Sequence, residues 1–193
     1  MTNPSDIVLQ VQHEALLMPW PTDGNLGGFL SFETGAAWRD FIVGLGIDPH
    51  IPAIVRAKFD RAQRLYLFGW IDFNLVKAGE LAALIALELA LMDRYGGAVP
   101  RRRRSFSTLL VHMVEADGLT DAKIPMSVRS GGSAIGQLTG DVHPTLAERR
   151  NLLAHGDPFD GLPTGGLLEL VRDLINYAYR GYIAEAAALA RVT

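Results

Sequence analysis

The stretch PTLAERRNLLAHG, residues 144–156, organises the rest of the chain. Thr145 and Glu148 have the spacing of a capping box, in which each side chain accepts a hydrogen bond from the backbone amide of the other residue. Gly156 follows the last residue of the pattern, which is where glycine commonly ends a helix. We therefore predict a short helix over residues 146–155.

Three side chains of this predicted helix could take part in catalysis or binding: Arg150, Asn151 and His155. At about 100° per residue, Asn151 and His155 share a face, whereas Arg150 and His155 point about 140° apart. A straight helix therefore does not bring Arg150 and His155 together in one chain. Either the last turn is distorted before Gly156, or two chains combine these residues across a twofold axis.

Hydrophobic periodicity predicts further helices in the rest of the chain. We expect them at about residues 36–43, 52–73, 76–95 and 167–188. One more helix is expected to end at about residue 115, with either Ser105 or Ser107 as its cap. Pro52 is placed like the first residue of its helix, and Thr164 is the expected cap of the last one. A short strand is expected at residues 5–12, and residues 19–28 are expected to form no regular element. Residues 127–140 contain four glycines and are expected to form a mobile loop. Residues 157–166 are expected to form another loop.

Composition limits the classes of protein that this chain can represent. The 193 residues, 49% hydrophobic and 20% charged, suit one domain with a real core and an added terminal segment. The net charge of -3 argues against general coating of nucleic acids, although a local basic patch can still hold a phosphate chain. The absence of cysteine excludes disulfides, thiolate metal sites and a cysteine nucleophile.

Location and cofactors follow from motifs that the chain lacks. The N-terminus has no signal-peptide pattern, and no apolar block is long enough to span a bilayer, so we expect a cytoplasmic protein without a membrane segment. No nucleotide-binding glycine loop and no serine-hydrolase elbow occurs. His13, His50, His112 and His143 lack metal-ligand spacing, so neither a metal nor a cofactor is expected.

The pattern Arg150-Asn151-x-x-x-His155 before Gly156, which follows two long apolar helices, resembles the R-x4-6-H motif of the HEPN family. These are small all-helical proteins, and the supporting context covers roughly residues 51–188. The resemblance implies an all-α, HEPN-like bundle of four to five helices over residues 49–193. Residues 1–48 would form an irregular, partly extended arm that packs on this core. It also implies a homodimer whose shared cleft contains both motifs.

The chemistry that the resemblance implies is metal-independent RNA cleavage. His155 would take the proton of a ribose 2′-OH or give one to the 5′-oxygen, and Arg150 would hold the phosphate. Asn151 would orient the phosphate or the imidazole, and the product would end in a 2′,3′-cyclic phosphate. The family further suggests a toxin or defence protein with a neutralising partner. The alternatives are a non-catalytic HEPN-like domain that binds a protein or nucleic acid, and a structural dimer in which Arg150 and His155 are incidental.

Several other charged residues have two interpretations each. Glu88 lies in the apolar stripe of the second long helix and needs a partner, which is either Arg150 or His155, or another basic residue or solvent at the rim. Glu80 is expected to be only a favourable charge near a helix start. Arg149 and the arginine run are candidates for RNA phosphate contact, or else surface charges in a solvated linker. The run comprises Arg101, Arg102, Arg103 and Arg104.

Overall fold

The computed structural model describes residues 14–156 and 161–190, so the strand predicted at residues 5–12 lies outside the described residues. The fold is mostly helical, with 62% helix and one small N-terminal hairpin. The described part of the chain contains nine α-helices rather than the expected four to five. The elements are β1 (Leu16–Pro19), β2 (Phe29–Phe32), α1 (Gly35–Gly44), α2 (Ala53–Phe68), α3 (Asn74–Tyr95), α4 (Phe106–Glu115), α5 (Pro125–Ser130), α6 (Ile135–Thr139), α7 (Leu146–His155), α8 (Leu167–Ala178) and α9 (Arg180–Ala190).

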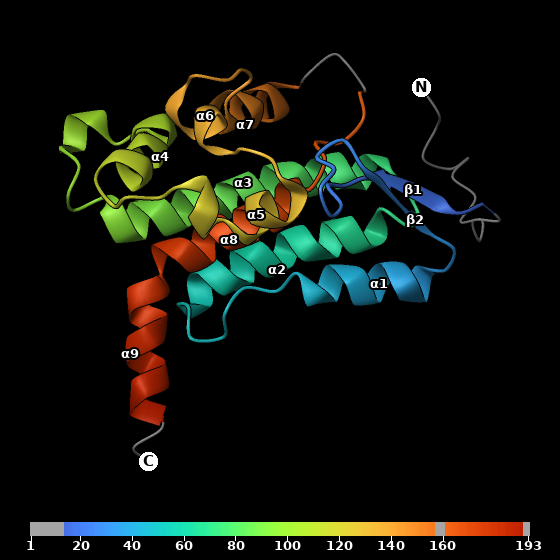
Figure 1. The fold of residues 1–193 in the computed structure, drawn as a ribbon, viewed down its shortest axis with the longest axis horizontal. Helices are drawn as coiled ribbons and strands as arrows, with labels where there is room; N and C mark the ends of the chain where they lie inside the picture. Colours follow the sequence, from blue (N-terminus) through green and yellow to red (C-terminus); the bar gives the residue numbers. More distant parts are fainter. Residues whose placement is uncertain (1–13, 157–160, 191–193) are drawn as a thin grey trace.

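Helix α3 is the centre of the molecule. It runs antiparallel to α2, with α1 beyond α2 on one side and α6 and α7 on the other (Figure 1). Leu84, Leu87 and Leu91 are fully buried along one stripe of α3. Small residues let α2 approach closely, since a Cβ atom at Gly79 would meet the Tyr66 ring at 2.6 Å. Helix α3 is buried on more than one side, because α2, α4, α7 and α8 all pack on it.

The helices predicted at residues 52–73 and 167–188 differ from those in the structure. Helix α2 begins at Ala53, with Pro52 as the cap residue rather than the first helical one, and it ends at Phe68 instead of residue 73. Gly69 follows. A Cβ atom at this position would meet Val76 and Tyr66, so the lack of a side chain lets the chain turn into α3. The expected last helix, residues 167–188, is two helices. Gly166, in the left-handed conformation at φ 69°, precedes α8 where Thr164 was expected to be the cap.

The break between α8 and α9 is held by side chains at the junction. Arg180 donates to both carboxylate oxygens of Asp117 at 2.7 Å and stacks on the Tyr177 ring. Tyr179 donates to Asp93 at 2.6 Å. These contacts fix the start of α9, and the rest of that helix projects away from the body (Figure 1).

The prediction of a mobile loop at residues 127–140 is wrong. Helices α5 and α6 occupy most of it, and Gly131 and Gly140 end them with φ values of 69° and 100°. The start of α6 is held by Asp121, whose carboxylate accepts from the Ser133 hydroxyl and from the Ala134 amide, both at 2.7 Å. Two of the four glycines therefore end helices, and a third, Gly136, lies inside α6.

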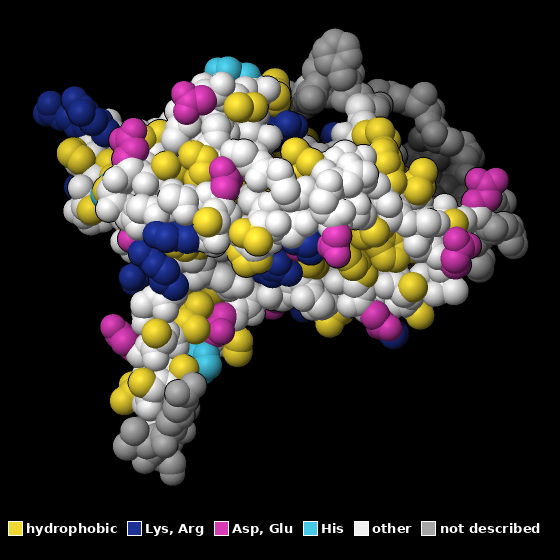
Figure 2. Space-filling model, in the orientation of Figure 1, with side chains coloured by type: hydrophobic (Ala, Val, Ile, Leu, Met, Phe, Trp, Pro, Cys, Tyr) yellow, Lys and Arg dark blue, Asp and Glu magenta, His cyan; other side chains and the backbone are white. Residues whose placement is uncertain are grey.

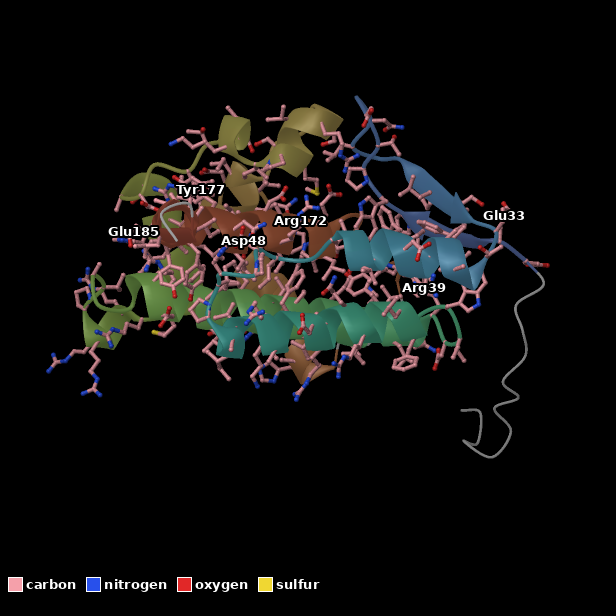
Figure 3. The ribbon with its side chains drawn as sticks, turned by 90° about the horizontal axis from the view of Figure 1, so that it is seen from below. Glu33, Arg39, Asp48, Arg172, Tyr177 and Glu185 are labelled. Carbon is pink, nitrogen blue, oxygen red and sulfur yellow. The ribbon has the colours of Figure 1, made fainter. Side chains whose placement is uncertain are left out.

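The N-terminal segment is more ordered than the sequence suggested. The helix predicted at residues 36–43 is confirmed as α1, capped by the Thr34 side chain. Strands β1 and β2 were not predicted, and they pair antiparallel with Leu16 opposite Phe32. Charged side chains such as Glu33 and Arg39 lie on the outer surface of this segment (Figure 3).

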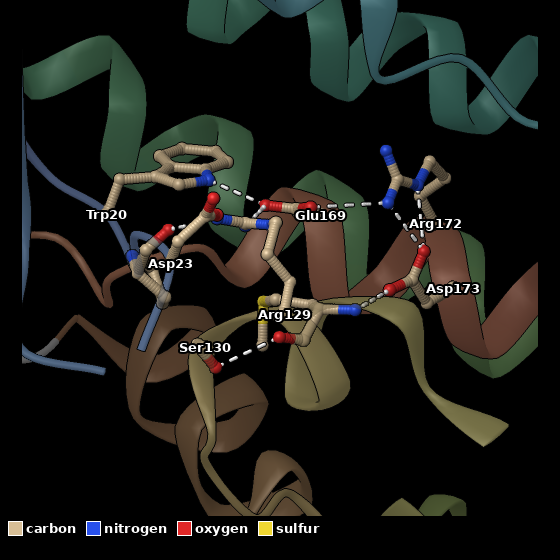
Figure 4. Close-up of polar contacts among 9 residues, drawn as sticks. Trp20, Asp23, Arg129, Ser130, Glu169, Arg172 and Asp173 are labelled. Carbon is tan, nitrogen blue, oxygen red and sulfur yellow. Dashed lines mark hydrogen bonds and ion pairs between the residues drawn. The ribbon is translucent and has the colours of Figure 1, made fainter. Parts of the chain in front are cut away.

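A buried polar network joins the N-terminal segment to the helices (Figure 4). The Trp20 indole donates to the Glu169 carboxylate at 2.8 Å, and Arg129 donates to the same carboxylate oxygen at 2.7 Å. Arg172 bridges Glu169 and Asp173 on α8. The Asp173 carboxylate also accepts from the Met126 amide at the start of α5, and burial raises its pKa. The segment and α5 are therefore attached to α8 at one place.

Candidate functional site

Helix α7 has the predicted boundaries, Leu146–His155. The Thr145 hydroxyl accepts from the Glu148 amide at 3.1 Å, and the Glu148 carboxylate accepts from the Thr145 amide at 2.8 Å. Gly156 ends the helix with φ 76°. The capping box is complete, so the start of the helix is set by residues within its own first turn. It packs on α3, α4 and α6, and Leu146 is its one fully buried side chain among those described.

Arg150 points toward α3. Its guanidinium donates to the Glu88 carboxylate at 2.7 Å and to the Asn151 side-chain oxygen at 3.0 Å. The Arg150 side chain is 32% exposed and that of Glu88 26%. Of the two interpretations of Glu88, the structure shows the pair with Arg150. A charge-assisted hydrogen bond of this kind fixes a guanidinium more firmly than a solvent-exposed pair does.

His155 and Asn151 lie on the opposite, open face. Both line a groove of about 720 Å³ that runs along α7, and both are exposed. The remaining lining residues are His143, Pro144, Glu148, Leu152 and Gly156. Arg150 is not among the lining residues. Because α7 stays helical through His155, the last turn does not rotate His155 toward Arg150 within one chain.

Asn151 therefore connects the two halves of the motif. Its side-chain oxygen accepts from Arg150, while the residue itself lines the groove with His155. The site in one chain has an imidazole and an amide that face solvent, and a guanidinium anchored behind them. Chemically, this arrangement offers a proton-transfer group and an anion-binding group, but not on the same face.

Arg149 lies elsewhere than the sequence suggested. It is half-buried, its guanidinium donates to the Thr164 hydroxyl at 3.1 Å, and it does not line the groove. Its Nε atom is buried without a partner among the described residues. Burial lowers the pKa of the Arg149 guanidinium. In this position Arg149 attaches α7 to the segment that leads into α8.

Glu80 completes that attachment, and the expectation that it is only a charge near a helix start is wrong. Its side chain is fully buried, and its carboxylate accepts a hydrogen bond from the Thr164 amide. Lys77 lies 3.7 Å from the other carboxylate oxygen. Burial raises the pKa of Glu80, and the nearby Lys77 charge offsets part of this rise. Sequence patterns missed this residue because its partner, Thr164, is 84 positions away.

The arginine run lies away from the groove. Arg101, Arg102 and Arg103 form an exposed 3-10 turn beyond the end of α3, and the Arg104 guanidinium donates to the Val99 carbonyl at 3.0 Å. Glu88, the partner of Arg150, lies seven residues before the end of α3, which is about 10 Å along the helix axis. Lys and Arg side chains form separate groups on the face in Figure 2, with acidic side chains elsewhere on it. The structure does not bring this run into the lining of the groove.

Residues 14–156 and 161–190 contain no group of three His, Asp or Glu side chains arranged to hold a metal ion. Among the described helices, none has the length and apolarity needed to cross a bilayer. Comparison of the chain with protein-family models, with curated proteins and with solved structures finds no match.

Proposed function

We propose that this chain is a HEPN-type, metal-independent endoribonuclease that acts as a homodimer. The observation that carries the proposal is the arrangement on α7. His155 and Asn151 line an open groove, and Arg150 is anchored by Glu88 next to Asn151. The HEPN-like character of the helical bundle is part of the same proposal.

The residues have complementary roles in this chemistry. The exposed imidazole of His155 exchanges a proton with the ribose 2′-OH or the 5′-oxygen. The guanidinium of Arg150 binds the phosphate oxygens as negative charge accumulates on them. Asn151 orients the phosphate beside His155. The product carries a 2′,3′-cyclic phosphate and a free 5′-OH.

The separation of Arg150 and His155 within one chain supports the proposed homodimer. A second copy related by a twofold axis perpendicular to α7 would run its α7 antiparallel to the first and bring the Arg150 of each chain level with the His155 of the other. The open groove beside α7, with Leu152 48% exposed, offers a surface for this pairing. Each cleft would then contain residues of both chains.

The wider role is also a proposal. An active ribonuclease harms its own cell unless it is controlled, which fits a cytoplasmic toxin or defence protein with a neutralising partner. The exposed arginines 101–103 would extend the contact with RNA phosphates, in a manner that weakens with salt.

A second candidate function is a non-catalytic domain that binds a protein partner through the same groove. Leu152, which lines the groove and is 48% exposed, favours it, and so does Val142, which is 49% exposed next to the lining residue His143. In that case Arg150 would remain engaged by Glu88 and would not contact phosphate.

The test is cleavage of a mixed pool of single-stranded and structured RNA in EDTA by the wild type, Arg150→Ala and His155→Ala, with the product ends mapped. If the proposal is right, the wild type produces RNA fragments with cyclic phosphate ends, and the two variants are folded but do not cleave RNA. His50→Ala is the control, because His50 is an exposed histidine outside the groove. A wild type that forms dimers but never cuts RNA would favour the binding domain.

A further inference from the structure

The groove along α7 contains a second imidazole that the HEPN-like motif does not include. His143 precedes α7 and lines the groove together with Asn151 and His155. Its Nδ1 atom lies 2.8 Å from the Glu148 carboxylate, and its side chain is 65% exposed. The chain therefore places two histidines at the two ends of one groove, with Asn151 between them.

Glu148 holds His143 in a defined orientation. Hydrogen bonds from the His143 ring and the Thr145 amide keep the pKa of Glu148 below its usual value, so the carboxylate is charged at neutral pH. A charged carboxylate only accepts hydrogen bonds, so the Nδ1 atom must carry the proton that it shares with Glu148. The Nε2 atom is then the one left for a ligand, which is the same division of roles that a carboxylate imposes on the histidine of a catalytic triad.

Cleavage of RNA through a cyclic phosphate needs two proton transfers. One group removes the proton of the 2′-OH as the bond from the 2′-oxygen to phosphorus forms, and another gives a proton to the 5′-oxygen as its bond to phosphorus breaks. In each cleft of the proposed dimer, which pairs the Arg150 of one chain with the His155 of the other, the motif provides a single histidine for both transfers. A groove with two imidazoles can carry out both without a metal ion.

We propose that His143 is the general acid of this site, that His155 is the base, and that Glu148 is the positioning residue of His143. The inference rests on the proposed ribonuclease function. The assignment of acid and base follows from Glu148, since an imidazolium at His143 has a carboxylate beside it to balance its charge. Positions 148 and 155 are separated by about 10 Å along α7, so the two imidazoles can reach from opposite ends of the groove toward one phosphate bound beside Asn151, with the 2′-oxygen on one side of the phosphorus atom and the 5′-oxygen on the other.

The test compares two substrates with different leaving groups. One is an RNA dinucleotide, whose 5′-oxygen needs a proton to leave, and the other is a uridine 3′-phosphate ester of p-nitrophenol, whose leaving group needs none. His143→Ala should slow dinucleotide cleavage by about 100-fold or more but leave cleavage of the p-nitrophenyl ester nearly unchanged. His155→Ala should slow both reactions, because both need the 2′-OH deprotonated.

Glu148→Gln separates positioning from folding, because glutamine can still complete a capping box. It should slow dinucleotide cleavage while the melting temperature stays at the wild-type value. His50→Ala is the matched control, since His50 also has a carboxylate, that of Asp48, 2.8 Å from its Nδ1 atom but lies outside the groove. It should leave both reactions unchanged.

Two results would overturn the assignment of His143 while the ribonuclease proposal stands. One is a wild type that cuts the dinucleotide and a folded His143→Ala that cuts it equally fast. The other is an equal loss on both substrates in His143→Ala, because a structural role does not depend on the leaving group. A wild type that cleaves neither substrate would overturn the ribonuclease proposal and this inference together.

Discussion

The pair between Glu88 and Arg150 allows a quantitative prediction. Exposed ion pairs contribute about 0.2–1 kcal/mol, whereas removal of one partner of a buried pair costs about 3–5 kcal/mol. The two atoms here are 2.7 Å apart, and the side chains are 26% and 32% exposed, which places the pair between these limits. We expect Glu88→Ala to lower the free energy of unfolding by about 1–2 kcal/mol. For a chain of this length the melting temperature should fall by about 2–8 °C.

A double-mutant cycle isolates the interaction from other effects of the substitutions. Glu88→Ala, Arg150→Ala and the double variant are compared with the wild type in urea unfolding followed by circular dichroism. We expect a coupling energy of at least about 0.5 kcal/mol, because the two side chains are in direct contact. Glu115→Ala removes an exposed glutamate, which has no ion-pair partner among the described residues, and should change stability little.

The same substitution tests whether Glu88 serves the site. If Glu88 aims Arg150, Glu88→Ala should reduce RNA cleavage by about tenfold, equivalent to about 1.4 kcal/mol of transition-state stabilisation. A coupling energy of zero, or a more stable Glu88→Ala protein, would refute the reasoning that this contact holds Arg150. Unchanged cleavage with a normal coupling energy would limit Glu88 to a structural role.

Three further substitutions test other parts of the structure. Thr145→Ala removes the cap of α7 and should lower the free energy of unfolding by about 1 kcal/mol, whereas Thr145→Ser should not, as urea unfolding will show. Gly79→Ala should destabilise the fold by about 1–3 kcal/mol, because the new Cβ would meet the Tyr66 ring; if its melting temperature equals that of the wild type, the close packing of α2 on α3 is wrong. Glu80→Gln tests burial through pH. Because the folded state raises the pKa of Glu80 from 4.5, its protonated form is favoured by folding, and this contribution is present below pH 4.5 and lost as pH rises through the folded pKa. The stability of Glu80→Gln relative to the wild type should therefore increase with pH above about 4.5, and a difference that stays constant from pH 4 to 8 would contradict the assignment.

Local signals predicted the parts of the fold that depend on neighbouring residues. The boundaries of α7 were predicted because Thr145, Glu148 and Gly156 all act within a few residues of the helix ends. The long helix α3 was predicted within two residues at its start, since its apolar pattern continues over its whole length. The cap of α4 at Ser105 is confirmed for the same reason.

The missed features depend on partners that are distant in the sequence. Helix α5 is too short to be stable alone, and the Asp173 carboxylate on α8 holds its first turn. The strands β1 and β2 are short and surround a turn-rich segment, and their attachment to Glu169 by Trp20 spans 149 positions. Glu80 and Arg149 resemble surface charges until Thr164 is placed between them.

In the candidate site, too, some features could be predicted from neighbouring residues and others depended on distant partners. The residues of the motif and their faces on α7 followed from helical geometry, and so did the separation of Arg150 from His155. The choice of Arg150 as the partner of Glu88 needed the packing of α7 on α3. The place of His143 in the groove also needed the structure, because His143 lies before the helix and no spacing rule connects it to His155.

The measurement that tests the central claim most directly is cleavage of RNA by a mixture of two inactive variants, Arg150→Ala and His155→Ala, after their subunits have exchanged. If each cleft combines the Arg150 of one chain with the His155 of the other, half of the dimers in an equal mixture are mixed, and each mixed dimer has one intact cleft. The account predicts that cleavage returns to about a quarter of the wild-type rate in EDTA, with cyclic phosphate ends. An active wild type whose variants stay silent after proven exchange, or a wild type that does not cut RNA at all, would contradict the account.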